Sequence, residues 1–249
     1  MPSGAMPALK FVGLALLISL QLYFLGCSKV SGDESRWQVY RRCRLKTATY
    51  ALSGRKLNKQ DGDSFNVDCQ QDGENPAFEK EIRLYFVDAP EAKFKEYKDG
   101  KNNGKRLDEQ AAYFLLSRDE VTVVGVQARN FTQKFLSSGV GAHQGGYFAV
   151  TTVAERVYGD PERIYGFVWH HVESGAKRFL HEELVKAGLV RLGKTKGPDA
   201  LCLEGDPCGV VNKAKLKAYE DQARKKNAGG WYHTAKNWHR KTHRDDIEL

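Results

Sequence analysis

The sequence predicts an α+β protein, a small closed β-barrel supported by about three helices. Segments rich in β-branched and aromatic residues fill the first two thirds of the chain, with turn residues such as DGD and QDGEN between them. Amphipathic helical segments interrupt these strands and then end the chain. Strand propensity alone does not distinguish a barrel from a β-sandwich, so both architectures stay open at this point.

The individual elements follow from local composition. Six segments are rich in strand-forming residues and are expected to be strands: 47–52, 64–69, 81–88, 121–128, 147–155 and 163–172. Three segments place apolar residues on one helical face: 105–118, 177–188 and 212–230. Gly188 and Gly229 lie where the last two helices should end, because glycine readily adopts the left-handed conformation found at helix C-termini.

The first 27 residues differ in composition from the rest of the chain. Lys10 precedes an apolar stretch from Phe11 to Leu25, which suits a signal peptide better than a membrane-spanning helix of about 20 residues. The closing FLGC resembles a bacterial lipobox, so residues 1–27 are expected to be a lipoprotein signal peptide with lipidation at Cys27. A cleaved secretory signal and an uncleaved anchor are the alternatives. All three would export the protein, and the lipobox would hold it in the membrane of a bacterial cell envelope.

Residues 28–44 are mostly polar at their start and are expected to be a tether between the membrane and a folded domain. The formal charge of +8 and a pI near 9.1 suit an anionic partner such as nucleic acid, anionic lipid or an acidic polymer. A merely solubilising surface explains the charge equally well.

Besides Cys27 the chain has an even number of cysteines, which suits disulfides in an oxidising compartment: Cys43, Cys69, Cys202 and Cys208. We favour a Cys202–Cys208 bond, which closes a short loop rich in Gly and Pro, together with a Cys43–Cys69 bond. A zinc site is the alternative, but neither pair has the separation of about two to four residues that zinc motifs use.

Three short stretches carry residues suited to chemistry. The DGD at 61–63 has the composition of a hairpin turn. IRLYFVDAPEA, at 82–92, places charged residues at both ends of an apolar strand, and ERIYGFVW, at 162–169, opens another strand with an arginine. Taken singly, each stretch is also compatible with an ordinary turn or an edge arginine.

The stretch 82–92 raises a geometric question. Ile82, Leu84 and Phe86 alternate and should face the core. Arg83 and Asp88 are five residues apart, so in a regular strand they point to opposite faces. The two can meet only if a bend or bulge separates them, and a straight strand over 81–88 would keep them apart.

The order of these stretches is more specific than any one of them. DGD is followed by R-x4-D-x-P-E at 83–91, by RIYGFV at 163–168, by HEELV and AGLV within 181–190, and by QARKK and Trp231 near the end. Together they resemble the staphylococcal nuclease (thermonuclease) family over residues 45–235, which leaves 236–249 as a basic C-terminal tail. The resemblance implies a five-stranded OB-fold β-barrel with about three flanking helices.

The resemblance also implies a calcium site at the mouth of the barrel. Asp63 and Asp88 correspond to the carboxylate ligands, and Ala89 to a residue that contributes its main-chain carbonyl, where the family usually has Thr. Calcium prefers oxygen ligands, and a site with only two carboxylates should bind weakly. Weak sites fill at the roughly millimolar calcium of extracellular fluids.

Three further positions correspond to the family's catalytic residues. Arg83 and Arg163 correspond to the two phosphate-binding arginines, a role suited to a permanently charged bidentate donor. Glu91 corresponds to the proposed general base, which would take a proton from the attacking water. Arg163 is matched by the strand that follows it, because the preceding VYGDPE differs from the family pattern. Residues 129–146 are expected to lie in an insertion.

These assignments predict a calcium-dependent phosphodiesterase that hydrolyses DNA, with RNA as a second substrate to test, and with little sequence preference. The resemblance implies cleavage that leaves a 5′-hydroxyl and a 3′-phosphate. The protein is expected to be a monomer without a protein partner, anchored to the membrane by lipid. The alternative is a non-catalytic module on the same fold that binds nucleic acid or another envelope component.

Overall fold

The computed structural model describes residues 38–46, 60–70, 77–138, 147–152, 156–157, 160–171, 176–193, 200–201 and 211–234. The expected signal peptide with Cys27, the expected strand 47–52, Cys202 and Cys208, and the basic tail 236–249 lie outside these residues. Within the described ranges, no helix combines the length and the apolar character needed to cross a membrane.

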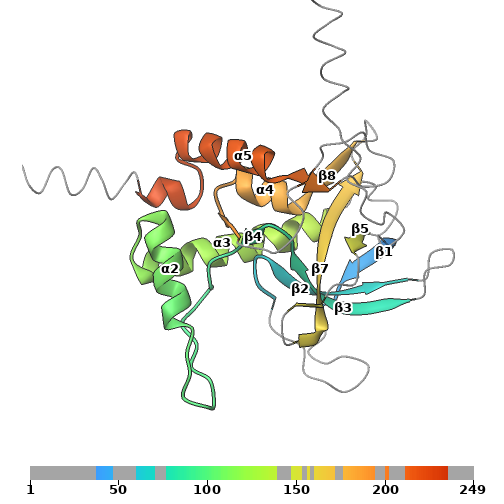
Figure 1. The fold of residues 1–249 in the computed structure, drawn as a ribbon, viewed down its shortest axis with the longest axis horizontal. Coiled ribbons are helices and arrows are strands. Elements are labelled where there is room, and N and C mark those ends of the chain that lie inside the picture. Colours follow the sequence, from blue (N-terminus) through green and yellow to red (C-terminus); the bar gives the residue numbers. More distant parts are fainter. Residues whose placement is uncertain are drawn as a thin grey trace, which may run out of the picture.

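Five strands are hydrogen-bonded into a closed ring (Figure 1). They are β1 (Gln38–Leu45), β2 (Ser64–Cys69), β3 (Phe78–Leu84), β5 (Phe148–Thr152) and β7 (Asp160–His171). Antiparallel pairs join β3 to β2, β2 to β1, β1 to β5 and β5 to β7, and the parallel pair β3–β7 closes the ring. The short β6 (Arg156–Val157) and β8 (Lys177–Phe179) also pair with β7, which makes a seven-stranded sheet. The expected α+β class is confirmed, and its centre is a barrel-like ring.

The interior of the ring is the main hydrophobic core. Ile82 and Leu84 on β3 are fully buried, as the alternation along this strand predicts. Phe65 and Val67 on β2 and Ile164 on β7 pack in the same cluster. Because these side chains come from neighbouring strands of the ring, closing the ring and burying the core are the same event.

The first strand begins earlier than the sequence indicated. Residues 38–44, which we expected to be tether, belong to β1, where Tyr40 and Cys43 are 4% and 0% exposed. The side chains of Cys43 and Cys69 face each other across the β1–β2 pair and form a disulfide. This is one of the two bonds that the cysteine spacing favoured. The correction follows from burial, since a tether has no reason to contribute two core side chains.

Four helices are labelled in Figure 1, one more than expected: α2 (Gly104–Phe114), α3 (Arg118–Ser137), α4 (Leu180–Lys186) and α5 (Lys213–Lys225). Residues 230–234 are helical as well. Three of them, α2, α4 and α5, overlap the expected helices at 105–118, 177–188 and 212–230, and each is shorter than expected. Gly188 follows the end of α4 in the expected left-handed conformation, with a φ of 66°. Gly229 also has a positive φ, of 54°, but α5 ends earlier, at Lys225, and Asn227 with a φ of 50° follows it. Figure 1 shows α3 running across the middle of the molecule, with α2 at one end and α4 and α5 above it.

The strand expected at 121–128 is wrong, because these residues lie inside α3. The run Val121-Thr122-Val123-Val124 has strand propensity, but a capping box at Ser117 and Glu120 fixes the helix start. Val121, Val124, Ala128 and Phe135 then bury one face of the helix. The expected insertion at 129–146 accordingly begins as the second half of this helix, up to Ser137.

Two small strand pairs complete the described structure. β4 (Val87–Asp88) pairs with β9 (Arg191–Leu192), and β10 (Ala200–Leu201) pairs with β11 (Val211–Asn212). Near the C-terminus, Trp231 packs on the ring of Phe114 with a centroid distance of 4.8 Å. This contact attaches the end of the described chain to α2.

Candidate active site

The strand that carries Arg83 bends where the sequence required it to bend. β3 ends at Leu84, Tyr85 and Phe86 form a bend, and β4 starts at Val87. Phe86 has a φ of 64°, a conformation that an L-residue keeps only where its surroundings enforce it. Its side chain is buried against Phe167, and its carbonyl accepts a hydrogen bond from the amide of Gly193 at 2.7 Å. The bend therefore turns Arg83 and Asp88 towards each other.

Arg83 bridges the two carboxylates that the sequence assigned to calcium. Its Nη1 donates to Oδ1 of Asp63 at 2.7 Å, and its Nη2 donates to Oδ1 of Asp88 at 2.5 Å. Asp63 is fully buried and Asp88 is 8% exposed. Two buried carboxylates thus converge on one cationic group.

Asp63 reaches this position from the DGD turn, which the chain closes with a hydrogen bond from the amide of Asp61 to the carbonyl of Ser64 at 2.7 Å. Its second oxygen, Oδ2, accepts from the amide of Ala89 at 2.5 Å. The DGD segment is therefore a turn, as its composition indicated. It also contributes Asp63 to the group of charged side chains around Arg83 and Asp88, which we call the cluster.

Asp88 also binds two arginines that the sequence analysis did not assign. Arg106 of α2 donates to its Oδ1 at 2.7 Å, and Arg191 of β9 donates to its Oδ2 at 2.7 Å. Gln110, one helical turn after Arg106, donates to Oδ2 at 3.1 Å and to the carbonyl of Ala89 at 2.9 Å. Every carboxylate oxygen of Asp63 and Asp88 therefore accepts at least one hydrogen bond from the protein.

Glu91 lies in the same network and is 4% exposed. Arg106 Nη1 is 2.8 Å from its Oε1, Lys95 Nζ is 2.9 Å from its Oε2, and Asn103 donates to Oε2 at 3.2 Å. The amide of Glu91 donates to the side-chain oxygen of Gln110 at 3.0 Å. Arg106 thus links the expected base to the expected metal ligand, Asp88.

Arg163 lies apart from this network. It is opposite Glu81 in the parallel β3–β7 pair and forms an ion pair with it at 2.5 Å. Arg83 is opposite Tyr165, which is two residues after Arg163 on β7. Arg83 and Arg163 therefore lie on the same face of the sheet, at successive positions on that face. No contact of Arg163 with Asp63, Asp88 or Glu91 is found among the described residues. Its expected role in phosphate binding stays a prediction.

Helix α3 supports both acidic turns from behind. A Cβ at Gly125 would lie 2.5 Å from the carbonyl oxygen of Pro90 and 2.6 Å from that of Glu91, so only glycine permits this approach. Gly62 is equally close to α3, since its Cβ would be 2.7 Å from that of Ala128. Thr132 donates to the carbonyl of Gly62 at 2.6 Å. One helix, mispredicted in part as a strand, therefore sets the separation of the two turns.

The carboxyl groups of the cluster have different acidities. Burial raises the pKa of Asp63 to about 7, and although Arg83 opposes this shift, the charges of Asp88 and Asp61 reinforce it. Burial acts in the same direction on Asp88, but Arg106, Arg83 and Arg191 outweigh it and hold its pKa well below the usual value. Burial is likewise overcome at Glu91, whose pKa is lowered by Arg106 and Lys95. At neutral pH, Asp88 and Glu91 are therefore the firmly ionised members.

No family model matches this chain, and no curated protein is similar to it. The chemistry of the site therefore has to be argued from its own residues.

The donor atoms fit calcium in kind. The carboxylates of Asp63 and Asp88 and the carbonyl of Ala89 are hard oxygen donors, which calcium prefers. Both carboxylates already face one cationic group, the guanidinium of Arg83, each through a different nitrogen. Within the described residues, no three His, Cys, Asp or Glu side chains form a ready metal cluster. A calcium ion at this place would have to displace the guanidinium of Arg83 from the carboxylates.

The sequence did not reveal five residues of the network: Lys95, Asn103, Arg106, Gln110 and Arg191. Arg106 and Gln110 are four residues apart on a helix that was expected, which places them on one face. That spacing was the only available signal. Arg191 meets Asp88 from 103 positions away along the chain, and only the β4–β9 pairing shows it.

Proposed function

We propose that the protein is a calcium-dependent phosphodiesterase that hydrolyses nucleic acid. The observation that carries the proposal is the bend at Phe86, which assembles Arg83, Asp63, Asp88 and Glu91 into one largely buried cluster. Buried acids whose pKa values are shifted in opposite directions are typical of functional sites, and several guanidinium groups beside them suit a phosphate ligand. The chain's charge of +8 suits a polyanionic substrate.

The proposed fold is an OB-fold barrel. The ring order β1–β2–β3–β7–β5, with one parallel pair between β3 and β7, supports it. Small Greek-key barrels of this kind commonly bind oligonucleotides. The cluster lies where β3 leaves the ring, at the bend before β4.

The guanidinium groups would bind the substrate. Arg83 and Arg106 each make two ion pairs with the acids of the cluster, so both can exchange carboxylate oxygens for phosphate oxygens. Such donors matter most as negative charge builds up on the phosphate in the transition state. Calcium, when bound by Asp63, Asp88 and the Ala89 carbonyl, would supply further positive charge at the same place. Arg163 would contact the next phosphate along the strand.

Glu91 would accept the proton of the attacking water at one of its carboxylate oxygens. Arg106 and Lys95 lower its pKa in the free protein, which makes it a weak base there. Substrate phosphate would compete with Glu91 for these two cations. Each cation that moves to phosphate raises the pKa of Glu91, so the base strengthens when substrate is bound.

The non-catalytic alternative has a specific observation in its favour. All four carboxylate oxygens of Asp63 and Asp88 are already bonded within the protein, and three arginines converge on Asp88. A network this complete can hold a fold together without any turnover. Cleavage assays separate the two functions directly.

Export to a bacterial cell envelope remains part of the proposal. The Cys43–Cys69 disulfide supports it, because structural disulfides persist mainly in oxidising compartments. Lipidation at Cys27 would keep the domain at the membrane, where extracellular calcium and nucleic acid are both accessible.

The test is cleavage of single-stranded DNA by the purified protein, with calcium or with a chelator. Glu91→Gln keeps the size of the side chain and should lower the rate by roughly 10²- to 10⁴-fold. Arg106→Ala should lower it by roughly 10²- to 10³-fold, and Arg163→Ala tests whether the more distant arginine contributes. Arg118→Ala, in an exposed pair with Asp108, is the control and should cleave like the parent.

Calcium-independent cleavage would contradict the metal requirement. A Glu91→Gln variant as active as the parent would remove Glu91 from the mechanism. Salt-sensitive binding without any cleavage would support the non-catalytic module.

A further inference from the structure

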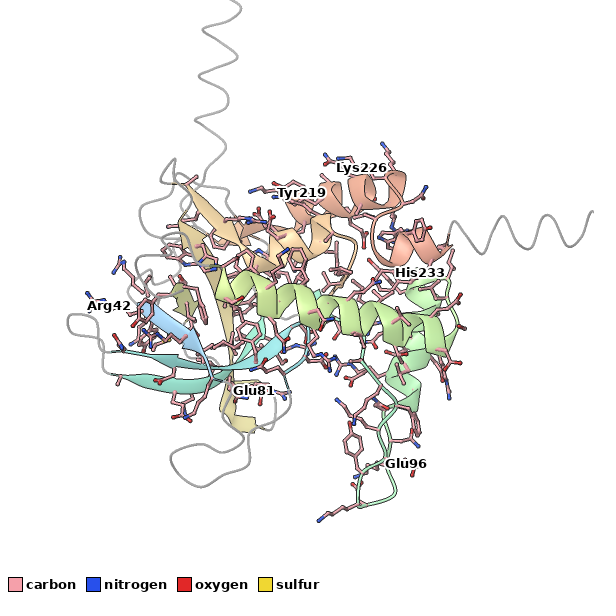
Figure 2. All side chains as sticks on the ribbon, turned by 180° about the vertical axis from the view of Figure 1, so that it is seen from behind. Arg42, Glu81, Glu96, Tyr219, Lys226 and His233 are labelled. Carbon is pink, nitrogen blue, oxygen red and sulfur yellow. A yellow bond between two sulfur atoms is a disulfide. The ribbon has the colours of Figure 1, made fainter. Side chains whose placement is uncertain are left out.

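A hairpin projects from the body of the protein directly beside the cluster. Residues 92–103 leave the turn that carries Glu91 and return at the start of α2 (Figure 1). Figure 2 shows Glu96 on this hairpin, well away from the sheet and the helices. We call residues 92–103 the finger.

The finger has a defined backbone. Glu96 and Asn102 form a β-bridge, and the amide of Tyr97 donates to the carbonyl of Lys101 at 2.8 Å. The amide of Gly100 donates to the carbonyl of Tyr97 at 3.0 Å, and Gly100 takes a φ of 75°, which a tight turn favours. Such a hairpin presents its side chains without first having to order them.

The base of the finger is tied to the cluster. The amide of Lys95 donates to the side-chain oxygen of Asn103 at 2.7 Å, and the amide of Asn103 donates to the carbonyl of Lys95 at 3.1 Å. Both side chains also contact Oε2 of Glu91, at 2.9 and 3.2 Å. A molecule that lies along the finger is therefore led to Glu91. The tip is roughly 13 Å beyond Lys95, at about 3.3 Å per extended residue.

The finger exposes aromatic rings among cations. Phe94 is 48% exposed and Tyr97 is 51% exposed, and they are two of the five large hydrophobic side chains left exposed in the described ranges. Four lysines and two acids share the finger with them: Lys93, Lys95, Lys98, Lys101, Glu96 and Asp99. Neither ring belongs to the hydrophobic clusters of the core, and the charged neighbours give the segment a net positive charge.

We propose that the finger is a docking site for single-stranded nucleic acid. Phe94 and Tyr97 offer ring faces on which unpaired bases stack, and Lys93 and Lys98 meet the phosphates between them. A duplex hides its base faces in its own stack, so this surface selects single strands. The inference rests on the proposed function, because it names the substrate form that the same site would receive.

The test uses the full chain in chelator, so that binding is measured without cleavage. Fluorescence anisotropy follows a labelled oligothymidylate of about twelve nucleotides, within the site sizes known for related barrels. Replacing both Phe94 and Tyr97 by Ala should weaken binding by at least roughly tenfold, because each substitution removes a ring on which a base would stack. Phe94→Tyr with Tyr97→Phe keeps both rings and should bind like the parent.

Two further variants complete the design. Lys93→Gln with Lys98→Gln should lower the slope of log affinity against log salt by roughly 1.4, at about 0.7 per phosphate of a single strand. Tyr232→Ala removes an exposed aromatic ring elsewhere and should leave the affinity unchanged.

Unchanged affinity of the double alanine variant would overturn the finger proposal. Equal weakening for a duplex of the same length would overturn it as well, since the surface would then respond to charge and not to bases. Because chelator prevents calcium-dependent cleavage, the result does not depend on turnover. A protein that binds through the finger but never cleaves would sink only the hydrolase proposal.

Discussion

Two buried polar regions of this protein are organised in opposite ways. In the cluster around Asp88, acids and guanidinium groups saturate one another. At the start of α4, His181 is also completely buried, but neither of its ring nitrogens has a hydrogen-bond partner among the described residues. It lies between the rings of Phe167 and Phe179. A titratable group can therefore be buried in two ways. Its charge is paired, as at Asp88, or the group stays neutral, as at His181.

The pKa values express this difference. Arg106, Arg83 and Arg191 overcome the effect of burial and lower the pKa of Asp88, so it stays charged. Burial lowers the pKa of His181 to about 3, and the nearby Lys215 and Lys186 act in the same direction, so it stays neutral. Asp88 keeps its charge because of its partners. The stability that His181 contributes depends instead on the pH.

The largest expected effect comes from breaking the paired region. Arg83→Met should lower the free energy of unfolding by about 3–5 kcal/mol, because it leaves two buried carboxylates without their shared cation. Denaturant unfolding followed by circular dichroism measures the change. Arg118→Met, at an exposed ion pair, is the matched control. Equal stability of the two variants would show that pairing in the cluster contributes little.

A smaller effect is expected from pH at the unpaired region. Unfolded His181 should titrate near its ordinary pKa of about 6.5, whereas the folded protein excludes the proton until about pH 3. The unfolded state therefore binds more protons between these values, and stability falls as the pH falls. The slope is roughly 1.4 kcal/mol per pH unit once below pH 6. The free energies of unfolding of the parent and of His181→Leu should diverge by about 2 kcal/mol between pH 7 and pH 5, and a difference that does not change with pH would refute the prediction.

The smallest effect is expected from His181→Leu at pH 7. Leucine removes two buried nitrogens for which the described part of the chain offers no partner, so stability should rise by about 1 kcal/mol. His170→Leu is the opposite control, because it removes the hydrogen bond between the Nε2 of His170 and the carbonyl of Phe135, 2.8 Å apart. Thermal unfolding of both variants should give shifts of opposite sign. Destabilisation by His181→Leu would mean that the histidine has a partner after all.

The sequence predicts the local part of this structure well. Side chains alternate between the two faces of a strand, and this rule needs only the order of consecutive residues. Applied to Arg83 and Asp88, it anticipated the bend between them. Cysteine spacing and count anticipated the Cys43–Cys69 bond. Both depend on rules that hold before the chain is folded.

The predictions that failed concern features that depend on tertiary contacts. Four consecutive β-branched residues in α3, Val121 to Val124, favoured a strand until their packing against the core decided for a helix. Arg106 is 18 positions and Arg191 is 103 positions from Asp88, and nothing local to either arginine names its partner. The guanidinium groups that complete the cluster could therefore be found only in the folded protein.

The parallel pair β3–β7 has a consequence for how the protein is made. It joins Ile82 to Ile164, so the ring cannot close until more than half of the chain has been synthesised. Strands β1 to β3 can form hairpins early, and Asp63 can meet Arg83 as soon as they do. Arg191, which meets Asp88 through the β4–β9 pair, is synthesised after all five strands of the ring. A chain cut short before β9 therefore contains every ring strand and both cysteines of the disulfide but lacks the arginine that completes the cluster.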